Sequence, residues 1–600
     1  MMSKTTGIYA SDIRFDRIDG CYDATFSANA MRLLKERFLL IRNDGDDETP
    51  ADMMQRIAST LAQTETENGE VWQDLFFRTM SKLLFLPGSR VMANAGTTNP
   101  QLGNCFVLPL ADDRREILKT FSDACDIKGN GGGCGFNYSN IRPRGDIVRE
   151  HDELACGPTA FLKLFDSGSA IFRQKGRYES GNLAIINIDH PDAIEFASAK
   201  LTDGDLRLTN ISVGINDAFM EAVKAGKSWQ LKDPRTGEVL KEVDAAGHFN
   251  AICELAWQTG DPGVVFLDHL NRDNPLLDSI GPINAMNTCG EVGLFPYESS
   301  NLGYLNLVRL LKSNPSGRRG MDLFDDALLR AVVHVGIRMI DNSISASWYP
   351  VDRIFESVRS NRRIGLGVTG WADCLALAGI AYDSDEAIDL AEAFAGTLRS
   401  HAEEATKTLA IEKGAYPNSK LSGEVEKRNI SLLALPPSGN HAIIFDSSFS
   451  IEPYFSLYYL ERVMGDQEFF RKNKYLEEAL LEIGMDPDPV FAEIAKNAGS
   501  VQDVERVPQQ IRTRFKIAHE IAPEIHVRVQ AAFQKYVDNG VTKTVNLPFD
   551  SKPGDVARCY MLAWELGCKG VTVYRDRSRS KQAIEFDGRR LEESNGVLPN

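Results

Sequence analysis

Five consecutive residues, Asn287-Thr288-Cys289-Gly290-Glu291, place a thiol between an amide and a carboxylate. A carboxylate so close to a thiol can act as a general base toward a hydroxyl group, and the amide can hold that hydroxyl in place. Polar groups gathered on one rigid loop supply the positioning that such a step requires. A lone Cys is more often structural, so Cys289 is a catalytic candidate only because Asn287 and Glu291 flank it.

A second candidate thiol, Cys105, lies far upstream in the run Gly103-Asn-Cys-Phe-Val-Leu-Pro109. The chain has ten Cys, and neither C-x-x-C nor H-E-x-x-H occurs. A zinc site or a thioredoxin-like motif therefore has little support, and we expect no metal site. In a reducing compartment most of the other Cys should be small buried hydrophobic residues.

Three turn-forming runs have both a structural and a functional interpretation. The Gly-rich run 128–135 lacks the Lys-Ser/Thr ending of a P-loop, so it marks either two closely approaching backbones or an approach to a ligand. The run 365–370 is a literal G-x-G-x-x-G, but the preceding residues 353–363 have a helical and charged pattern, which disfavours a dinucleotide site. The turn 436–441 leads into an apolar run that we predict as a strand, and it is also a candidate nest of N–H donors for phosphate.

The bulk composition is that of a globular protein, with 43% hydrophobic and 25% charged residues in a chain of 600. The net charge is 67 − 84 = −17, which disfavours general nucleic-acid binding but not small phosphorylated ligands held locally by backbone N–H groups. No apolar run is long enough to span a membrane, and the first residues lack an export signal, so we expect a cytoplasmic protein.

Hydrophobic periodicity predicts a helical region over residues 1–84 and alternating strands and helices over 85–578. This alternation favours one large α/β domain. The charged residues 579–600 should form a mobile tail. The clearest individual predictions are strands at 105–108, 183–188, 210–215 and 571–574, a hairpin at 229–240, and helices at 217–223, 385–412 and 555–566.

Many ordered motifs resemble the large catalytic subunit of ribonucleotide reductases, and most of all the class II, adenosylcobalamin-dependent branch. The resemblance covers residues 80–580 and implies a ten-stranded α/β barrel with the radical Cys on a central finger loop. The motifs include Leu86-Pro-Gly-Ser, Asn104-Cys-Phe-Val-Leu-Pro, Asn140-Ile-Arg-Pro-Arg-Gly-Asp146, Arg363-Ile-Gly-Leu-Gly-Val, Ile451-Glu-Pro and Gly567-Cys-Lys-Gly-Val-Thr-Val-Tyr-Arg-Asp576.

The resemblance implies a thiyl radical on Cys289 that abstracts the 3′ hydrogen of a ribonucleotide. It implies that Glu291 and Asn287 handle the hydroxyl protons. It further implies that Cys105 protonates the departing 2′-hydroxyl and supplies an electron. The matching substrate-contact positions are Ser89, Asn104, Gly133, Pro437, Ser438, Gly439, Asn440 and His441.

The family relationship also implies partners. Residues 173–182 and 206–210 match two loops that read a deoxynucleotide or ATP effector at a homodimer interface. The strand ending in Tyr574 has one Tyr where class I enzymes have an adjacent pair, so adenosylcobalamin is the implied radical source.

Two parts of the usual disulfide shuttle are missing. Ser300 occupies the position of the second redox Cys in Glu298-Ser-Ser-Asn-Leu-Gly303, and no Cys follows Cys568, so the carboxy-terminal pair is absent. A hydroxyl cannot form a disulfide. The electron donor is therefore open between an external thiol, a small reductant such as formate, and Cys134 as an alternative redox partner for Cys105.

We therefore expect a ribonucleoside di- or triphosphate reductase. Because both parts of the disulfide shuttle are missing, a first alternative stays open, namely a thiyl-radical enzyme that rearranges nucleotides without reducing them. The second alternative is a silent nucleotide-binding homologue, although such a copy need not keep Asn287, Cys289, Glu291 and Cys105 together.

Overall fold

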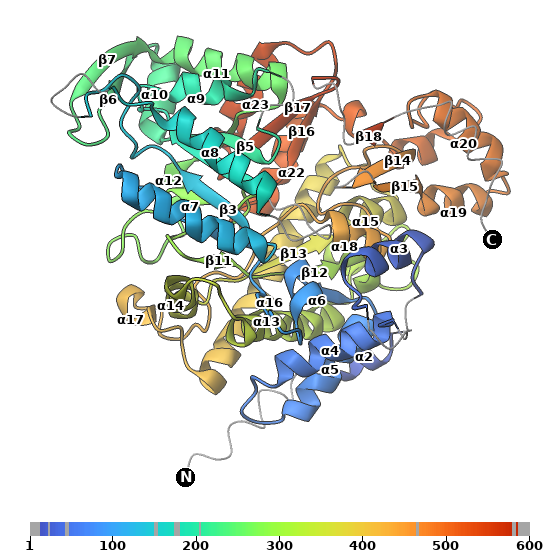
Figure 1. The fold of residues 1–600 in the computed structure, drawn as a ribbon. Helices are drawn as coiled ribbons and strands as arrows, with labels where there is room; N and C mark the ends of the chain where they lie inside the picture. The colour runs from blue at the N-terminus through green and yellow to red at the C-terminus, as the bar shows by residue number, and fades with distance from the viewer. Residues whose placement is uncertain are drawn as a thin grey trace.

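The computed structural model describes residues 13–21, 25–41, 47–148, 154–172, 181–202, 206–463, 467–578 and 584–585. The amino-terminal region forms the predicted helices α2 (Asp16–Asp19), α3 (Ala28–Arg37), α4 (Pro50–Ala62) and α5 (Gly69–Ser81). Helix α4 begins with a capping box, in which the Thr49 hydroxyl accepts the Asp52 N–H and the Asp52 carboxylate accepts the Thr49 N–H. In Figure 1, α2, α4 and α5 lie beneath the larger domain, with α4 and α5 beside the long helix α13 (Asp326–Ala346), whereas α3 lies beside α18 (Gly439–Phe445).

The larger domain is built around two sheets. Eight strands form one sheet in the order β11 (Ser299–Ser300), β2 (Cys105–Val107), β3 (Gly133–Asn137), β4 (Asn182–Asn187), β5 (Thr209–Ile215), β8 (Gly263–Phe266), β17 (Gly570–Arg575) and β16 (Thr544–Leu547). Strands β2 to β8 run parallel, and β17 pairs antiparallel with β8. The second sheet has the order β1 (Phe85–Pro87), β12 (Leu302–Asn306) and β13 (Gly365–Thr369).

Single bridges continue the second sheet toward the first. Leu366 pairs with Leu433, and Leu435 pairs with Val541, which leads into β16. Counting residues 432–435 as a strand gives two groups of five parallel strands, β2 to β8 and β12 to β17. This arrangement confirms the predicted α/β barrel fold, although between β13 and β16 the pairing is reduced to those bridges. Gly365 and Gly367 permit this approach, because added Cβ atoms would lie 2.7 Å from the Ala434 Cβ and 2.8 Å from the Ala434 oxygen.

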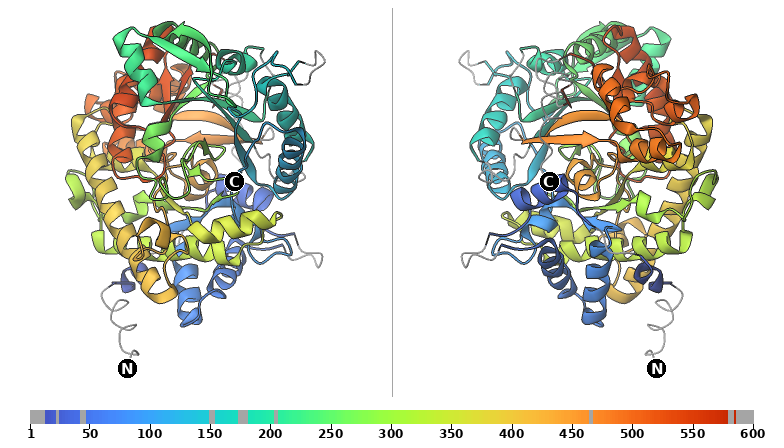
Figure 2. Two further views of the ribbon diagram at one scale, coloured as in Figure 1. Left: turned by 90° about the vertical axis from the view of Figure 1, so that its left-hand side faces the viewer. Right: turned by 90° about the vertical axis from the view of Figure 1, so that its right-hand side faces the viewer.

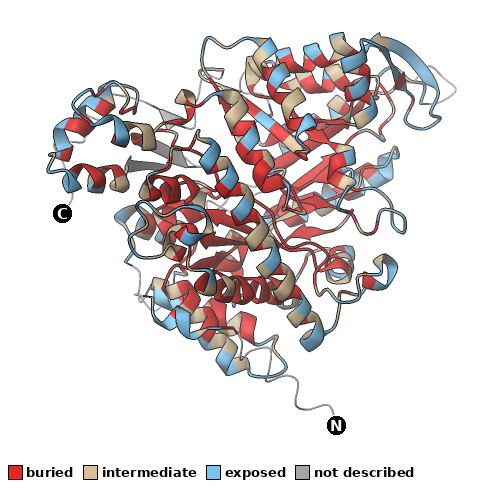
Figure 3. Cartoon of the chain, turned by 180° about the vertical axis from the view of Figure 1, so that it is seen from behind, coloured by how far each residue is buried: buried red, intermediate tan, exposed pale blue. Residues whose placement is uncertain are grey.

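The central barrel strands, such as β3, β4, β8 and β13, are almost wholly buried, as the red centre of Figure 3 shows. Helices α11 (Ala245–Thr259), α23 (Pro553–Glu565), α22 (Pro523–Gln534), α16 (Asp385–Lys413) and α13 pack on one another in that order around part of the barrel. The two side views in Figure 2 show the strands enclosed by helices. Each of these helices buries one apolar face in the core. This gives the helical periodicity from which alternating strands and helices were predicted.

Most local predictions are confirmed, including the helix α10 (Asp217–Ala225) and the hairpin β6 (Ser228–Lys232) and β7 (Val239–Asp244). The strand predicted at 441–445 is wrong, since these residues lie in helix α18 (Gly439–Phe445). A short, fully buried apolar run carries no periodicity that separates strand from helix. Of the predicted tail, 579–583 and 586–600 lie outside the described residues, and Ile584–Glu585 form strand β18, which pairs with β14 (Tyr458–Val463).

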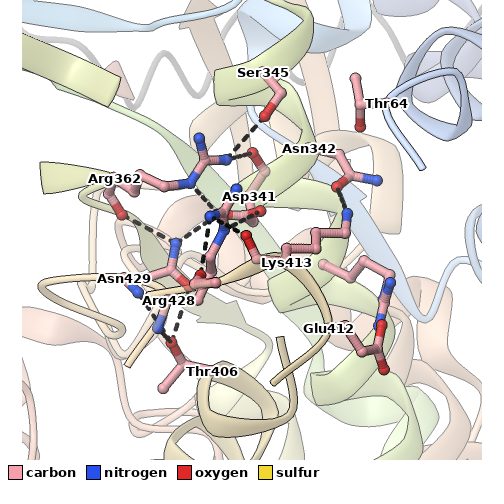
Figure 4. A network of polar contacts seen from close by, with 12 residues as sticks. Thr64, Asp341, Asn342, Ser345, Arg362, Thr406, Glu412, Lys413, Arg428 and Asn429 are labelled. Carbon is pink, nitrogen blue, oxygen red and sulfur yellow. Dashed lines mark hydrogen bonds and ion pairs between the residues drawn. The ribbon is translucent and has the colours of Figure 1, made fainter. Parts of the chain in front are cut away.

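A buried polar network ties the amino-terminal region to the barrel (Figure 4). The Asp341 carboxylate accepts hydrogen bonds from Arg362 Nε at 2.8 Å and Asn429 Nδ2 at 2.9 Å. Nearby, Lys413 Nζ donates to Asn342 Oδ1 at 2.6 Å and to Glu65 Oε1 at 2.8 Å, and Glu65 follows helix α4.

Among the described helices, none is long and apolar enough to cross a membrane.

Candidate active site

Residues 285–294 form a finger loop inside the barrel. Strands β9 (Ala285–Met286) and β10 (Gly293–Leu294) pair antiparallel as its stem, and Asn287 to Val292 form its tip. The tip is anchored on the far side of the barrel, because Thr542 Oγ1 donates to the Cys289 carbonyl at 2.8 Å and the Gly540 N–H donates to the Glu291 carbonyl at 2.6 Å. The finger loop thus holds Cys289 at a fixed place within the barrel.

Two glycines of β3 make room for the finger loop. A Cβ added at Gly135 would lie 1.9 Å from the Met286 carbonyl oxygen, and one at Gly133 would lie 2.3 Å from Thr288 Oγ1 and 3.1 Å from Cys105 Sγ. No side chain fits at such distances, so this part of the Gly-rich run is a close backbone approach. The same geometry shows that Thr288 and Cys105 share the space above Gly133.

The amide and the carboxylate of the pentapeptide are directly joined. Asn287 Nδ2 donates to Glu291 Oε1 at 2.5 Å, while Asn287 Oδ1 accepts the N–H groups of Glu291 at 3.1 Å and Val292 at 3.0 Å. Glu291 is buried, and its second oxygen, Oε2, has no hydrogen-bond partner among the described residues. Burial raises the pKa of Glu291 to about 7, against the lowering effect of the Asn287 hydrogen bond. A carboxyl group with this pKa can take and return a proton near neutral pH.

The thiol of Cys289 is exposed, but it borders an internal cavity of about 630 Å³. Pro437, Phe449, Phe455 and Lys543 also line this cavity. Although the cavity leaves Cys289 accessible, the surrounding barrel wall partly desolvates its thiol. This desolvation, then the charges of Glu291 and Cys105, raise the pKa of Cys289 well above its ordinary value. The thiol therefore stays protonated at neutral pH.

Cys105 begins strand β2 and lies near enough to Glu291 for the charge of that carboxylate to act on it. Burial and Glu291 raise the pKa of Cys105, whereas hydrogen bonding from the Thr288 side chain and from the Thr288 and Gly133 N–H groups lowers it. The finger loop and strand β3 thus supply donors around this sulfur. The structure brings Cys105, Cys289, Glu291 and Asn287 together, as the sequence predicts.

The predicted substrate-contact residues also cluster. Asn440 Nδ2 donates to Ser89 Oγ at 3.4 Å, and the Arg90 N–H donates to Asn104 Oδ1 at 3.3 Å. The Ser438 hydroxyl is occupied within the fold, since it accepts the Ser450 N–H at 2.7 Å. Gly439 begins helix α18, and Pro437 borders the cavity beside Cys289.

The side chain of His441 has a structural role. Its Nε2 lies 2.9 Å from the Pro87 carbonyl oxygen, and its ring stacks on Tyr304 with centroids 3.8 Å apart. Burial lowers its pKa to about 4, so the ring is neutral at neutral pH. His441 would therefore contact a phosphate through its backbone and not through its ring.

Cys134 lies in β3 between Gly133 and Gly135, whose missing side chains would point at the finger loop. Successive strand residues face opposite sides, so Cys134 faces away from the finger loop. It pairs in register with Phe106, whereas Cys105 pairs with Gly133. The two thiols thus point to opposite faces of the sheet, and this geometry does not support a Cys105–Cys134 disulfide.

Comparison with known proteins gives the family. The family model described as "Ribonucleotide reductase, barrel domain" matches residues 103–427 and 418–574, and the one described as "Ribonucleotide reductase, all-alpha domain" matches residues 24–100. The chain belongs to the ribonucleotide reductase large-subunit family. The resemblance seen in its motifs is therefore confirmed.

Two curated relatives of this ribonucleotide reductase chain are named vitamin B12-dependent ribonucleoside-diphosphate reductase. The Mycobacterium tuberculosis protein is 37% identical over 569 residues, which cover 93% of this chain and 79% of the relative. The Thermoplasma acidophilum protein is 34% identical over 627 residues, which cover 94% and 80%. A solved structure, the Actinobacillus ureae class Id ribonucleotide reductase alpha subunit, superimposes with a TM-score of 0.76 at 25% identity and covers 92% of this chain and 97% of that one.

Some site features of this reductase chain were not predicted. Thr542 and Gly540 hold the finger loop, yet neither lies in a run that the sequence singles out as a candidate site. Gly135, which admits the finger loop, belongs to the Gly-rich run 128–135, whose interpretation as a close backbone approach is confirmed. Of the predicted effector loops, residues 173–180 and 203–205 lie outside the described residues, while 206–210 lead into and begin β5 beside the cavity.

Proposed function

We propose that this protein is a ribonucleotide reductase that converts ribonucleotides to 2′-deoxyribonucleotides through a thiyl radical on Cys289. The observation that carries the proposal is the convergence of Cys289, Cys105 and Glu291 at the tip of the finger loop, inside the barrel of a chain that belongs to this family. Because the two relatives are named diphosphate reductases, ribonucleoside diphosphates are the first substrates to test.

Glu291 is the proposed general base for the substrate hydroxyl next to the carbon that loses its hydrogen atom. Its Oε2 is buried without a partner among the described residues, so a substrate hydroxyl would fill a vacant acceptor position. Asn287 fixes the other carboxylate oxygen at 2.5 Å and so orients the free one. Proton transfer by a group positioned in this way contributes roughly a 100- to 10,000-fold rate increase.

Cys105 is the proposed donor of the proton that converts the 2′-hydroxyl into a leaving water molecule. Its raised pKa keeps the proton on the sulfur until the substrate needs it. The Thr288 and Gly133 donors then stabilise the sulfur when it carries negative charge. Both functions require the finger loop to lie against β3, as it does above Gly133.

The substrate would enter with its sugar at the finger loop and its phosphates toward residues 437–441 and Ser89. Pro437 borders the cavity beside Cys289, and Asn440 connects the turn to Ser89. Backbone N–H groups in such turns bind phosphate oxygens without a net positive charge. That mode of binding suits a chain of net charge −17.

The proposed cofactor is adenosylcobalamin, in accord with the names of the two relatives. The exposed thiol of Cys289 borders a cavity of about 630 Å³, which has room for a nucleoside-sized group. Phe449 and Phe455, with ring centroids 5.9 Å apart, offer apolar faces on that cavity to a planar base. When bound, the cofactor supplies the unpaired electron for the thiyl radical on Cys289.

A homodimer with an effector nucleotide at its interface is part of the proposal. Leu118 of α7 (Arg114–Gly129) is 54% exposed, and Ile171 of α8 (Pro158–Ile171) is 73% exposed. The two helices lie side by side on the outer surface (Figure 1) and precede the predicted effector loop at 173–182. Exposed apolar residues on paired helices suit helix packing between two copies. The mass of the complex, measured with and without deoxynucleotides, should report a dimer that Ile171→Asp weakens.

The deciding assay is carried out without oxygen, with adenosylcobalamin, ribonucleoside di- or triphosphates and excess dithiothreitol, and products are identified by mass spectrometry. Deoxynucleotides that vanish with Cys289→Ala support the proposal. A nucleotide product at the oxidation level of the substrate would instead favour non-reductive radical chemistry.

Free thiols at all ten Cys agree with a reducing compartment, and the proposed location is the cytoplasm.

A further inference from the structure

The two-electron reduction proposed above needs a partner for Cys105, and residue 300 cannot be that partner. Ser300 lies directly opposite Cys105 across strands β11 and β2, and the Cys105 N–H donates to Ser300 Oγ at 3.2 Å. The position that a second thiol would need is therefore filled by a hydroxyl, which already serves as an acceptor. A hydroxyl cannot be oxidised to a disulfide with Cys105.

The other Cys residues, all of them described, offer no replacement. The Cys134 thiol is close enough to feel the charge of Cys105, as well as those of Lys128 and Cys125 on helix α7, but it faces away from the finger loop, on the opposite side of the sheet from Cys105. Four more, Cys253, Cys374, Cys559 and Cys568, are buried in other parts of the fold. Cys289 lies near Cys105 on the finger-loop side of the sheet, but a disulfide between these two would remove the thiol proposed to carry the radical.

The surroundings of Cys105 favour disulfide exchange. An added Cβ at Gly133 would lie 2.3 Å from Thr288 Oγ1 and 3.1 Å from Cys105 Sγ, so the hydroxyl and the sulfur border one small space. The Thr288 hydroxyl is buried and has no hydrogen-bond partner among the described residues, so it is available to donate to the Cys105 sulfur. A donor so placed stabilises sulfur as it gains negative charge, both as an attacking thiolate and as the leaving group of a disulfide.

The cavity is less suited to a carboxylate reductant. Among the described residues that line it, Lys543 is the one Lys or Arg. Its Nζ is engaged by Glu452 Oε2 at 2.5 Å and by His526 Nδ1 at 2.9 Å, and the side chain is fully buried. A small carboxylate such as formate would therefore find no unpaired cation there, whereas a neutral thiol needs none.

We propose that this enzyme takes its electrons from a low-molecular-weight thiol that forms a mixed disulfide with Cys105. The inference rests on the proposed ribonucleotide reduction. In each cycle the Cys105 S–H and one RSH are oxidised to Cys105–S–S–R, while the 2′ C–O bond breaks, a C–H bond forms, and the hydroxyl leaves as water. A second RSH attacks the R sulfur, which releases RSSR and restores the Cys105 thiol. The sum is ribonucleotide plus two RSH giving deoxyribonucleotide, RSSR and water.

The test compares the enzyme with and without thiol. Fully reduced protein is freed of thiol without oxygen, mixed with adenosylcobalamin and ribonucleotide, and quenched, and deoxynucleotide per chain is measured. We expect essentially none from the wild type, but about one per chain from Ser300→Cys, since that variant has its own dithiol. 2-Mercaptoethanol, a neutral monothiol, should restore turnover when added to the wild type, and a limiting amount should leave its adduct on the peptide that contains Cys105.

Three results would overturn the inference. The first is about one deoxynucleotide per wild-type chain without thiol, and Cys134→Ser would then show whether Cys134 is the internal donor. The second is turnover of the thiol-free wild type with formate, and the third is thiol-dependent turnover without an adduct on Cys105. Failure of the proposed function gives a different result, because no deoxynucleotide would form in either protein even with excess dithiothreitol. The adduct measurement uses the wild type alone and so does not depend on the folding of the variant.

Discussion

Ser300 and Cys105 face each other across an antiparallel strand pair, with the Cys105 N–H bonded to Ser300 Oγ at 3.2 Å. Directly opposed residues of such a pair have Cα atoms about 4.5–5.5 Å apart, which falls within the range that a disulfide spans. The backbone geometry at this pair therefore suits a disulfide, although Ser300 has no thiol to form one.

Ser300→Cys should restore a disulfide at this site. Under mild oxidation we expect the variant to lose two titratable thiols relative to its reduced form and to give a peptide linking residues 105 and 300 by mass spectrometry. Ser299→Cys is the matched control, because Ser299 pairs with Phe106 and has no thiol opposite it. An introduced thiol at position 300 that stays reduced while Cys105 is oxidised would contradict the facing geometry.

Cys289→Ser should abolish deoxynucleotide formation, by more than about a thousandfold, because a hydroxyl cannot carry the radical at a comparable bond energy. Cys289 borders the cavity, so its replacement fills no core space, and the midpoint of thermal unfolding should hardly change. Cys156→Ser, at an exposed thiol outside the site, is the control and should keep wild-type activity. Residual activity in Cys289→Ser near that of the control would remove Cys289 from the mechanism.

Glu291→Gln should lower turnover roughly 100- to 10,000-fold and change its pH dependence. Burial raises the pKa of Glu291 to about 7, so wild-type turnover should rise as pH passes through that value and the base loses its proton. The Gln variant has no such titration and should show no rise there. An unchanged pH profile in the variant would assign the titration to another group.

Glu291→Gln should raise the stability of the fold at alkaline pH, although it lowers turnover. The pKa of Glu291 is higher in the folded than in the unfolded protein, so its contribution to stability is greatest below about pH 4.3 and is lost as pH rises through about 7. At pH 8 the charged carboxylate destabilises the fold, and Glu291→Gln should raise the free energy of unfolding by about 1–3 kcal/mol. At pH 4 the two proteins should differ little, and denaturant unfolding at both pH values checks this.

Gly135→Ala tests the approach of the finger loop to β3. The new Cβ would lie 1.9 Å from the Met286 carbonyl oxygen, a backbone atom, so the finger loop must shift. A displacement of about 1 Å at the reacting groups should lower turnover about a hundredfold. Gly129→Ala, at the end of α7 where an added Cβ meets nothing within 4 Å, is the matched control. Equal activity in the two variants would show that the finger loop tolerates displacement.

Asp341→Asn should destabilise the protein by about 3–5 kcal/mol, because it leaves the buried Arg362 and the partly buried Arg428 without their shared carboxylate. Burial would raise the pKa of Asp341, but Arg362 and Arg428 outweigh it and hold the pKa at about 2. The stabilisation is therefore complete above about pH 4 and is lost as pH falls through about 2. Urea unfolding at pH 7 measures the loss, and a change below about 1 kcal/mol would show that the network relaxes around the amide.

The sequence alone determined the chemistry and most of the local structure. Asn287, Cys289 and Glu291 lie within one pentapeptide, so their association needs only a loop, and their proposed roles rest on the motifs that resemble the ribonucleotide reductase family. Long periodic elements such as α16 and β5 were predictable because each carries its own pattern. The run 441–445 was not, since its burial on all sides erases the pattern.

Only the tertiary structure decided which distant groups meet. Cys105 and Ser300 are far apart in the chain, and strand register alone makes them neighbours. Register also turns Cys134 away from Cys105, although Cys134 follows Gly133, the residue that pairs with Cys105. Among the described residues, Glu291 Oε2 has no hydrogen-bond partner, and the pKa of the Glu291 carboxyl group is raised. Both follow from burial by elements that are remote in the sequence. Residue type fixes what a side chain can do, whereas long-range packing fixes its partners and its access to water.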